Sequence, residues 1–440
     1  MEISVPESKS VGHRDLIVNF LTDTAQGTLR YNETYPITVE ESDSNDIRAT
    51  KNCINALVEA ATAATAAITA TGNDAPGEII LPAEESGSTL RFFIPVGIAV
   101  LDKLGMLDTT SLVFTTGGRL FERPLDDIKK CLEPHGVTII HDNDTRTIKI
   151  VCKKSHLQQI FEISGRLSSQ NISGLLMALP LLEHDSQICI TEEFNSKTYV
   201  DLTTDVLCRH GVNVEEGEMQ YEVAGNSYLT AKHVRICDGD WSSGAFLLCM
   251  KGLISDDSEL TVSGLNYDSP QGDRAITDFL EVMAGNAGNA NAGNADAGNA
   301  DKGSECISYN CKNIPDIVPY MAIYAAYKNA SNPNKSTRLL DVGRLKHKES
   351  DRISAVLDYL QKIGARSKFD GDNLTVYGAD LNYIRTIDEL KVSSYNDHRM
   401  AMTAFMLALG AGKIIDIDDI DCMAKSFPML PAIMKREFGI

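Results

Sequence analysis

The chain has 440 residues, enough for two or three domains with their own cores. Its formal net charge is −20, from 41 Lys and Arg against 61 Asp and Glu, which argues against nucleic acid or an anionic membrane surface as a partner. The ten cysteines have no metal-binding spacing, and we expect reduced thiols in a cytoplasmic protein. The N-terminal stretch MEISVPESKS lacks the features of a signal peptide, and no uninterrupted apolar run is long enough for a membrane span.

Six segments share one form, in which small or polar residues precede an apolar helical run. Their starts are roughly 75–80 residues apart, which is a regular period. Because these runs are apolar nearly all round, they predict helices buried in a core. In chain order the segments are ESKSVGHRDLIVNFL from Glu7, ESGSTLRFFIPVGIAVL from Glu85, RLSSQNISGLLMALPLL from Arg166, GDWSSGAFLLCMKGL from Gly239, IPDIVPYMAIYAAY from Ile314 and YNDHRMAMTAFMLAL from Tyr395.

A second series of more amphipathic helices is predicted between them, with polar faces nearer solvent. These helices are expected within residues 44–60, 121–133, 196–211, 269–283 and 348–364. Short β-rich runs are expected within residues 78–82, 111–117, 137–142, 147–153, 187–193, 235–240, 259–264, 374–378 and 414–421. Two helices and several strands therefore recur six times, which suggests two domains of three repeat units each.

One segment departs from this pattern. Residues 285–303, GNAGNANAGNADAGNADKG, form a Gly, Asn and Ala tract of low complexity. Such a composition cannot bury apolar surface, so we expect a flexible surface insertion. A calcium-binding glycine repeat would need a regular apolar position, which this tract lacks.

Positive side chains gather at the starts of the predicted helices, where the helix dipole disfavours cations. Any one of them is more often a solvated surface charge, but a bound multivalent anion would explain the group. Lys348 and Arg352 illustrate the expectation: four apart on one helix, they would repel by about 0.2–0.5 kcal/mol until an anion binds. The cations are Lys9, Arg14, Arg91, Arg119, Arg123, Lys348, Arg352, Arg399 and Lys425.

Two carboxylates, Asp316 and Glu349, lie among these cations in the sequence. An isolated carboxylate is usually a surface group or a helix cap. A carboxylate set among cations at buried helix ends can instead act as a general base or acid.

Motifs along the whole chain resemble those of the 5-enolpyruvylshikimate-3-phosphate synthase family. They occur in the family's order from Pro6 to Pro428, and KESDR and NDHRMAM are the most specific. The motifs are PESKSVGHR, SGSTLR, RLFERP, SSQNISGLLMALPL, GDWSSGAFLL, IPDIVPYMAIYAA, KESDRI, YNDHRMAM and AKSFP.

The resemblance implies an α/β fold, a two-domain inside-out α/β barrel called the enolpyruvyl transferase fold, with three βαβαββ units in each domain. The chain would cross between the domains near Val11 and near Asp238, with the active site in the cleft between them. The first domain would comprise residues 1–11 and 238–440, including the 285–303 insertion, and the second would comprise residues 12–237.

The resemblance also implies a reaction. The 5-hydroxyl of shikimate 3-phosphate would attack C2 of phosphoenolpyruvate while C3 is protonated, and the tetrahedral intermediate would lose phosphate. Because the C–O bond breaks rather than the P–O bond, arginines and lysines can stabilise the charge without a metal or cofactor. The partners would be these two small molecules, and the family default is a monomer.

The roles of individual residues follow from the same motifs. Asp316 would be the base at the 5-hydroxyl, and Glu349 the acid or base at the methylene group, with Lys9 sharing proton transfer. Phosphoenolpyruvate would be held by Lys9, Gly87, Arg123, Gln170, Arg352, Arg399 and Lys425. Shikimate 3-phosphate would be held by Lys9, Ser10, Arg14, Ser168, Ser169, Gln170, Ser196, Tyr199, Asp316 and Lys348. Arg344 stands where some members have a substrate-binding Asn.

Two alternatives remain. The UDP-N-acetylglucosamine enolpyruvyl transferase family shares the fold and uses a loop cysteine as the acid. The corresponding stretch here, FTTGGRLFERPLDD, contains no cysteine before Cys131. A non-catalytic anion-binding protein on the same fold is the second alternative, and the retention of both carboxylates argues against it.

Overall fold

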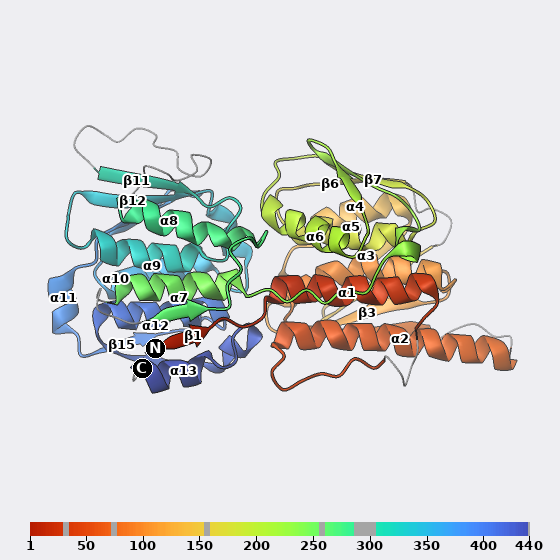
Figure 1. Cartoon of the computed structure of the whole chain (residues 1–440), viewed down its shortest axis with the longest axis horizontal. Helices are drawn as coiled ribbons and strands as arrows, with labels where there is room; N and C mark the ends of the chain where they lie inside the picture. The colour runs from red at the N-terminus through yellow and green to blue at the C-terminus, as the bar shows by residue number, and fades with distance from the viewer. Residues whose placement is uncertain (30–34, 72–76, 154–158, 255–259, 286–304, 439–440) are drawn as a thin grey trace. The chain divides into compact units, whose positions relative to one another are not determined.

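The computed structural model describes residues 1–29, 35–71, 77–153, 159–254, 260–285 and 305–438 (Figure 1). Residues 286–303 of the low-complexity tract lie outside the described residues, so the expected insertion stays a prediction. In the described chain, none of the helices is both long and apolar enough to cross a membrane.

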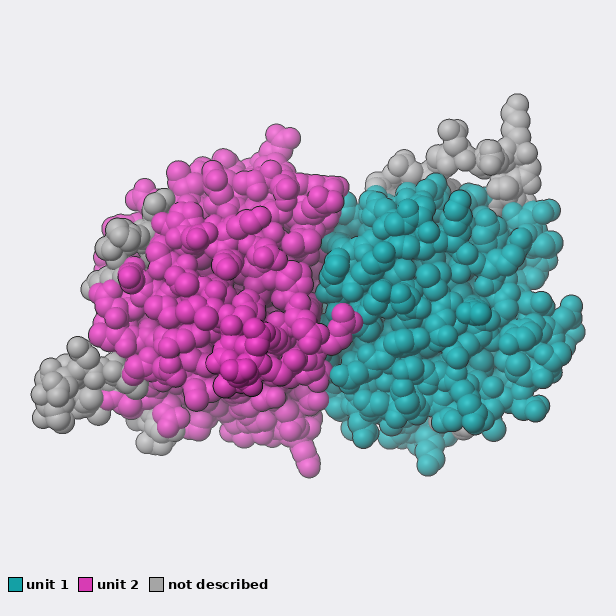
Figure 2. Space-filling model, turned by 180° about the vertical axis from the view of Figure 1, so that it is seen from behind, with its two compact units in different colours: residues 1–8, 238–440 teal, residues 9–237 magenta. Residues whose placement is uncertain are grey.

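The chain divides into two compact units, which Figure 2 colours separately. Unit 1 comprises Met1–Ser8 and Asp238–Ile440, and unit 2 comprises Lys9–Cys237. The first division falls slightly before the expected crossing at Val11, because Lys9 already begins a helix whose apolar residues join the core of unit 2.

Unit 2 contains two four-stranded sheets of the same topology. In each sheet the first two strands are parallel and the last two are antiparallel to their neighbours, giving the orders β2-β3-β5-β4 and β6-β7-β9-β8. The strands are β2 (Glu78–Glu84), β3 (Ser111–Thr116), β4 (Val137–Asp142), β5 (Thr147–Cys152), β6 (Ile160–Ile163), β7 (Ser186–Ile190), β8 (Val214–Glu216) and β9 (Gln220–Val223). A helix follows each of the first two strands, so each sheet belongs to a complete βαβαββ repeat.

Unit 1 contains a third complete repeat, with sheet order β11-β12-β14-β13. Two further parallel strand pairs accompany it, β1 with β10 and β15 with β16. The strands are β1 (Glu2–Ser4), β10 (Thr261–Ser263), β11 (Glu305–Asn310), β12 (Lys335–Leu340), β13 (Ser367–Phe369), β14 (Leu374–Tyr377), β15 (Glu389–Val392) and β16 (Ile414–Ile417). The described residues thus contain three complete repeats, against the six that we expected.

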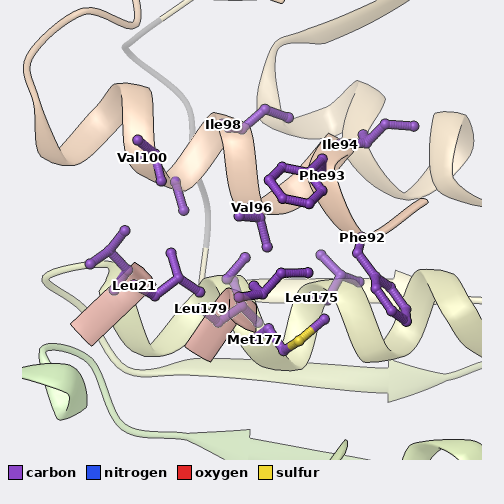
Figure 3. Close-up of a cluster of buried hydrophobic side chains, with 14 of the residues drawn as sticks. Leu21, Phe92, Phe93, Ile94, Val96, Ile98, Val100, Leu175, Met177 and Leu179 are labelled. Atoms are coloured by element: carbon purple, nitrogen blue, oxygen red, sulfur yellow. The ribbon is translucent and has the colours of Figure 1, made fainter. Parts of the chain in front are cut away.

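All six buried helices expected from the sequence are present, three in each unit. They are α1 (Lys9–Gln26), α3 (Gly87–Lys103), α5 (Ser169–Ala178), α7 (Trp241–Leu253), α9 (Val318–Asn329) and α12 (His398–Ala411). Every residue from His398 to Ala408 is buried, as expected for a helix that is apolar on all sides. Figure 3 shows the equivalent packing in unit 2, where Val96 and Phe93 of α3 face Leu175 of α5.

The five amphipathic helices are also confirmed: α2 (Asn45–Thr71), α4 (Asp126–Leu132), α6 (Lys197–Arg209), α8 (Ile276–Met283) and α10 (Arg352–Lys362). Two short helices, α11 (Leu381–Thr386) and α13 (Leu430–Phe438), were not predicted. The strand expected at residues 235–240 is wrong. This segment carries the chain from unit 2 to unit 1. In the described residues it forms no strand, and Gly239 makes an isolated antiparallel bridge with Glu7.

Candidate active site

Three helix starts of unit 1 meet at Arg352, the first residue of α10. Its side chain is 1% exposed. Its Nη1 donates to Asp316 Oδ1 at 2.9 Å, in the segment before α9. Its Nε donates at 2.8 Å to Oδ2 of Asp397, the residue whose side chain caps α12. Its Nη2 donates to Glu349 Oε2 at 2.8 Å and to Asp397 Oδ1 at 3.2 Å. A single guanidinium therefore holds the predicted base and the predicted acid together, and we call this group the unit 1 cluster.

Lys348 completes the surroundings of Asp316 in this cluster. Its Nζ lies 3.3 Å from Asp316 Oδ1. Burial alone would raise the pKa of Asp316, but Lys348, Arg352 and Arg399 outweigh it, so the pKa of this carboxyl lies well below its usual range. Burial lowers the pKa of Lys348, and Asp316 offsets part of that effect. The candidate base is therefore ionised at neutral pH.

Arg399 lies in the first turn of α12 and is 3% exposed. Its Nη1 donates to Tyr320 Oη at 3.4 Å, while its Nε has no hydrogen-bond partner among the described residues. Burial alone would lower the pKa of Arg399, but Tyr320, Asp316 and Asp240 raise it well above the ordinary value. Arg399 is thus a fixed buried cation with a donor available to an anion. Lys425, the other cation predicted here, is 7% exposed at the end of the short helix η8 (Asp421–Lys425).

The run from Arg344 to Arg352 differs from the expectation at Lys348. Lys348 precedes α10 in extended backbone, so it does not share a helix face with Arg352, and the predicted repulsion on one helix is wrong. Asp351 caps α10 by accepting from Ser354 N at 3.1 Å. Arg344 donates a hydrogen bond to the backbone carbonyl of Lys312.

Unit 2 gathers a second group of predicted ligands around the start of α3, which Ser86 caps. A Cβ atom at Gly87 would lie 2.4 Å from Arg123 Nη1 and 3.0 Å from Arg91 Nη1, so glycine is what lets both guanidiniums approach the backbone. Arg91 Nη1 donates to Gln170 Oε1 at 3.3 Å, and Gln170 Nε2 donates to Ser88 Oγ at 2.9 Å. Gly87, Arg123 and Gln170 are therefore brought together, and with Arg91 we call them the unit 2 cluster.

Lys9 begins α1 and pairs with Asp46 of α2, with 2.8 Å between Lys9 Nζ and Asp46 Oδ2. The backbone carbonyl of Asp46 accepts from Thr89 Oγ1 at 3.4 Å, in the first turn of α3. Lys9 is thus linked through Asp46 to the helix that carries the unit 2 cluster.

Arg14 is buried in unit 2 and donates to several oxygens of that unit. It is 2% exposed, its Nη1 donates to the carbonyl of Ser10 at 2.6 Å, and its Nη2 donates to the carbonyl of Tyr199 at 2.9 Å. Its Nε donates to Thr203 Oγ1 at 2.7 Å. Burial lowers the pKa of Arg14 to about 9, with a small opposing effect of Tyr199. The structure therefore uses Arg14 to position the backbone of two other predicted ligands.

The remaining predicted ligands lie at helix starts in unit 2. Ser168 precedes α5 and Ser169 begins it, and Ser196 precedes α6 in left-handed backbone with φ of 56°. Free backbone N–H groups at such starts can bind anions. Sequence analysis missed Asp397, Tyr320 and Asp46; Asp397 had a visible signal, because Asp before an apolar helical run is a typical cap.

Among the described residues, no group of three or more His, Cys, Asp or Glu side chains is placed to hold a metal ion. The arrangement instead combines buried cations, an ionised carboxylate and helix starts, which suits the binding and rearrangement of anionic substrates.

Known proteins are similar to this chain over its whole length. The profile of the family described as EPSP synthase (3-phosphoshikimate 1-carboxyvinyltransferase) matches residues 1–434. The 3-phosphoshikimate 1-carboxyvinyltransferase of Clostridium beijerinckii is 31% identical, with 100% of this chain and 95% of the relative covered. That of Clostridium acetobutylicum is 29% identical with the same coverage.

Solved structures share the fold. EPSP synthase from Acinetobacter baumannii superposes with a TM-score of 0.64 at 19% identity, covering 99% of this chain and 95% of that one. The enolpyruvyl transferase NikO from Streptomyces tendae gives a TM-score of 0.59 at 13% identity, covering 99% and 94%. The chain therefore has the enolpyruvyl transferase fold and belongs to the EPSP synthase family.

Proposed function

We propose that the chain transfers the enolpyruvyl group of phosphoenolpyruvate to the 5-hydroxyl of shikimate 3-phosphate and releases phosphate, a step of aromatic amino acid biosynthesis. The observation that carries this proposal is the Asp316 carboxylate, which is held between Lys348 at 3.3 Å and Arg352 at 2.9 Å. A half-buried, ionised carboxylate beside cations can accept a hydroxyl proton while the cations hold the anionic substrates.

Asp316 is a weak base in the unliganded chain, because Lys348, Arg352 and Arg399 lower its pKa. An anion bound to these cations offsets their charge and raises the basicity of Asp316. The carboxylate would thus become an effective base when the substrates are in place. Glu349, bound by the same Arg352, is the proposed acid at the methylene carbon, with Lys9 sharing the proton transfer.

The proposed phosphoenolpyruvate ligands are Lys9, Gly87, Arg123, Gln170, Arg352, Arg399 and Lys425. Arg352 already makes four hydrogen bonds to carboxylates, one from Nε, one from Nη1 and two from Nη2, so we assign it a positioning role as well as contact through Nη1. Arg399 is the better phosphate ligand, because its Nε has no partner among the described residues.

The proposed shikimate 3-phosphate ligands are Lys9, Ser10, Arg14, Ser168, Ser169, Gln170, Ser196, Tyr199, Asp316 and Lys348. Arg14 also positions Ser10 and Tyr199 through their carbonyls. The proposed ligands belong to both units, so we propose that both units act on one pair of substrates and close on them. Closure would exclude water from the tetrahedral intermediate. Small-angle scattering that is unchanged by shikimate 3-phosphate would count against closure.

Phosphate release from phosphoenolpyruvate tests the function directly. Release is expected with shikimate 3-phosphate as the acceptor and not with UDP-N-acetylglucosamine. Phosphate release with the UDP-sugar alone would mean that the chain transfers the enolpyruvyl group to UDP-N-acetylglucosamine. Phosphate release with neither acceptor would contradict both enzymatic functions.

Asp316→Ala tests the proposed base. We expect kcat to fall by about 10²–10⁴-fold, the usual contribution of a general base, with a much smaller change in the affinity for shikimate 3-phosphate. The measurements are steady-state kinetics and ligand titration. Equal losses in both would make Asp316 a structural or binding residue.

We also propose a cytoplasmic monomer. All ten cysteines are free thiols, which suits a reducing compartment. Sedimentation at equilibrium would test the monomer, and fractionation of cells would test the location.

A further inference from the structure

The chain passes between the units at two places, after Ser8 and before Asp238, and the two flanking segments are bonded to each other within unit 1. Ser8 N donates to the carbonyl of Asp238 at 2.7 Å, and Asp240 N donates to the carbonyl of Pro6 at 2.9 Å. Glu7 and Gly239 form an antiparallel bridge between these bonds. We call Pro6–Ser8 and Asp238–Asp240 the crossing segments.

One buried amide, that of Gln271, bonds to both crossing segments. Gln271 is 7% exposed and precedes the short helix η6 (Gly272–Ala275). Its Oε1 accepts from Ser8 Oγ at 2.9 Å. Its Nε2 donates to the carbonyl of Gly239 at 2.8 Å and to Asp238 Oδ2 at 3.0 Å.

The contacts of Gln271 continue into the body of unit 1. Its Oε1 also accepts from the backbone N of Trp241, the first residue of α7, at 3.2 Å. Ser269 Oγ donates to Asp238 Oδ2 at 2.5 Å and accepts from Gln271 Nε2 at 3.1 Å. The crossing segments are therefore attached to a buried helix start.

Close packing fixes the second crossing segment on its other side. A Cβ atom at Gly239 would lie 2.0 Å from the carbonyl oxygen of Gly264 and 2.7 Å from Val5 Cγ2. The first contact is with backbone, so no side chain at this position could be accommodated without moving the chain. The segment is thus confined by packing on one side and by Gln271 on the other.

We propose that Gln271 is a positioning residue that holds the two crossing segments together and so fixes the end of unit 1 from which the chain continues to Lys9 and Ser10. This inference rests on the proposed function, because Lys9 and Ser10 are substrate ligands only there. They follow Ser8 directly, so a displaced Ser8 displaces them. Gln271 itself is not among the proposed substrate ligands.

Gln271→Met tests the proposal, since Met has nearly the same shape and none of the amide's hydrogen bonds. The matched control is Asn329→Leu, which removes another buried amide of unit 1, one that donates to Thr337 Oγ1 at 3.1 Å and to the carbonyl of Val376 at 3.4 Å. Neither partner belongs to a crossing segment. Both variants should lower the unfolding midpoint, because each loses buried hydrogen bonds.

The two variants should differ in two other measurements. In Gln271→Met alone, amide hydrogen exchange at Ser8 and Asp240 should be at least about tenfold faster, as expected for the loss of one hydrogen bond. In Gln271→Met alone, kcat should also fall about tenfold and KM for shikimate 3-phosphate should rise, because Lys9 and Ser10 are proposed ligands of that substrate. Ser8→Ala removes one bond of the same group and should shift both measurements in the same direction by less; it serves if Gln271→Met does not fold.

Equal exchange and equal kcat in Gln271→Met and Asn329→Leu would overturn the proposal and leave Gln271 a purely structural residue. Exchange is measured on the chain without substrates. Exchange therefore tests whether Gln271 holds the crossing segments even if the wild-type chain releases no phosphate from phosphoenolpyruvate. That second result would contradict the proposed function and not the role of Gln271 in the crossing segments.

Discussion

The two units hold their buried arginines in opposite ways. Arg352 of unit 1 donates to three carboxylates, those of Asp316, Glu349 and Asp397. Arg14 of unit 2 is as deeply buried, but its acceptors are the carbonyls of Ser10 and Tyr199 and the hydroxyls of two other residues. The pKa values follow this difference: burial lowers the pKa of Arg14 to about 9, whereas the carboxylates outweigh burial and raise the pKa of Arg352.

The difference indicates that unit 1 and unit 2 contribute different groups to the proposed anion site. Unit 1 mixes charges of both signs, so it can supply a base and an acid beside its cations. In the unit 2 cluster Arg91 is bound by an amide and by two carbonyls, those of Gly87 and Pro124. These three acceptors are neutral, although the charge of Arg91 also acts to lower the pKa of Asp127. Uncharged acceptors leave the positive charge for substrate anions.

Arg352→Met should have the largest effect on stability. It leaves the fully buried Asp397 and its neighbours without their cation, and removing one partner of a buried pair typically costs about 3–5 kcal/mol. The free energy of unfolding by denaturant measures this. The control Arg338→Met breaks the exposed pair with Asp370, 3.0 Å apart, and should cost at most about 1 kcal/mol. Similar losses in the two variants would mean that burial of the cluster adds nothing.

Arg14→Met should cost less, about 1–3 kcal/mol, because it leaves unsatisfied carbonyls and hydroxyls but no unpaired charge. The same denaturant experiment measures it. Its control is Arg209→Met, an exposed arginine 2.8 Å from Asp205. If Arg14→Met lowered the free energy of unfolding as much as Arg352→Met does, the proposed difference between the arginines of the two units would be wrong.

Gly87→Ala should act on binding rather than on stability. The added methyl group would occupy the place of Arg123 Nη1 and displace that guanidinium. We expect KM for phosphoenolpyruvate to rise about 10–100-fold, the equivalent of one charged hydrogen bond. Gly77→Ala is the control, since a Cβ atom there meets nothing within 4 Å. A change in KM for shikimate 3-phosphate alone would contradict this assignment.

Asp273→Asn should have an effect on stability that depends on pH. Burial and the nearby Asp316 raise the pKa of Asp273 to about 7, while the hydroxyl of Ser242 and the charge of Arg399 act in the opposite direction. Asp240 faces the same group and raises its pKa further.

The unfolded chain ionises an aspartate near pH 4, so the folded chain holds the Asp273 proton more tightly between about pH 4 and 7, and stability falls as pH rises through this window. Asn cannot ionise. The melting temperature of Asp273→Asn should therefore exceed that of the wild type at about pH 8, and the excess should shrink toward about pH 4. An excess that is the same at both values would refute the assignment.

The helices could be predicted from the sequence because each combines an apolar run with a cap or a small polar start, as at Ser86 for α3 and Asp397 for α12. Several strands could not. β8, with the sequence VEE, has no alternation of apolar and polar residues, and its pairing with β9 comes from the sheet around it.

The motifs identified the candidate residues, but not what each of them contacts. The bond from Arg352 to Asp397 joins residues 45 positions apart, and that from Arg14 to Thr203 joins residues 189 apart. Such contacts depend on tertiary packing. For that reason the expected placement of Lys348 and Arg352 on one helix face was wrong, since Lys348 lies in extended backbone before α10.

The parallel pairing of β1 with β10 has a consequence for folding. Ser4 pairs with Ser263, so the first strand of unit 1 has no partner until residue 263 has been made. At about 5–20 residues per second, synthesis leaves this strand unpaired for roughly 13–50 s. Unit 2 is one continuous segment, Lys9–Cys237, and can fold during that interval. Unit 1 would then form after unit 2 has already folded.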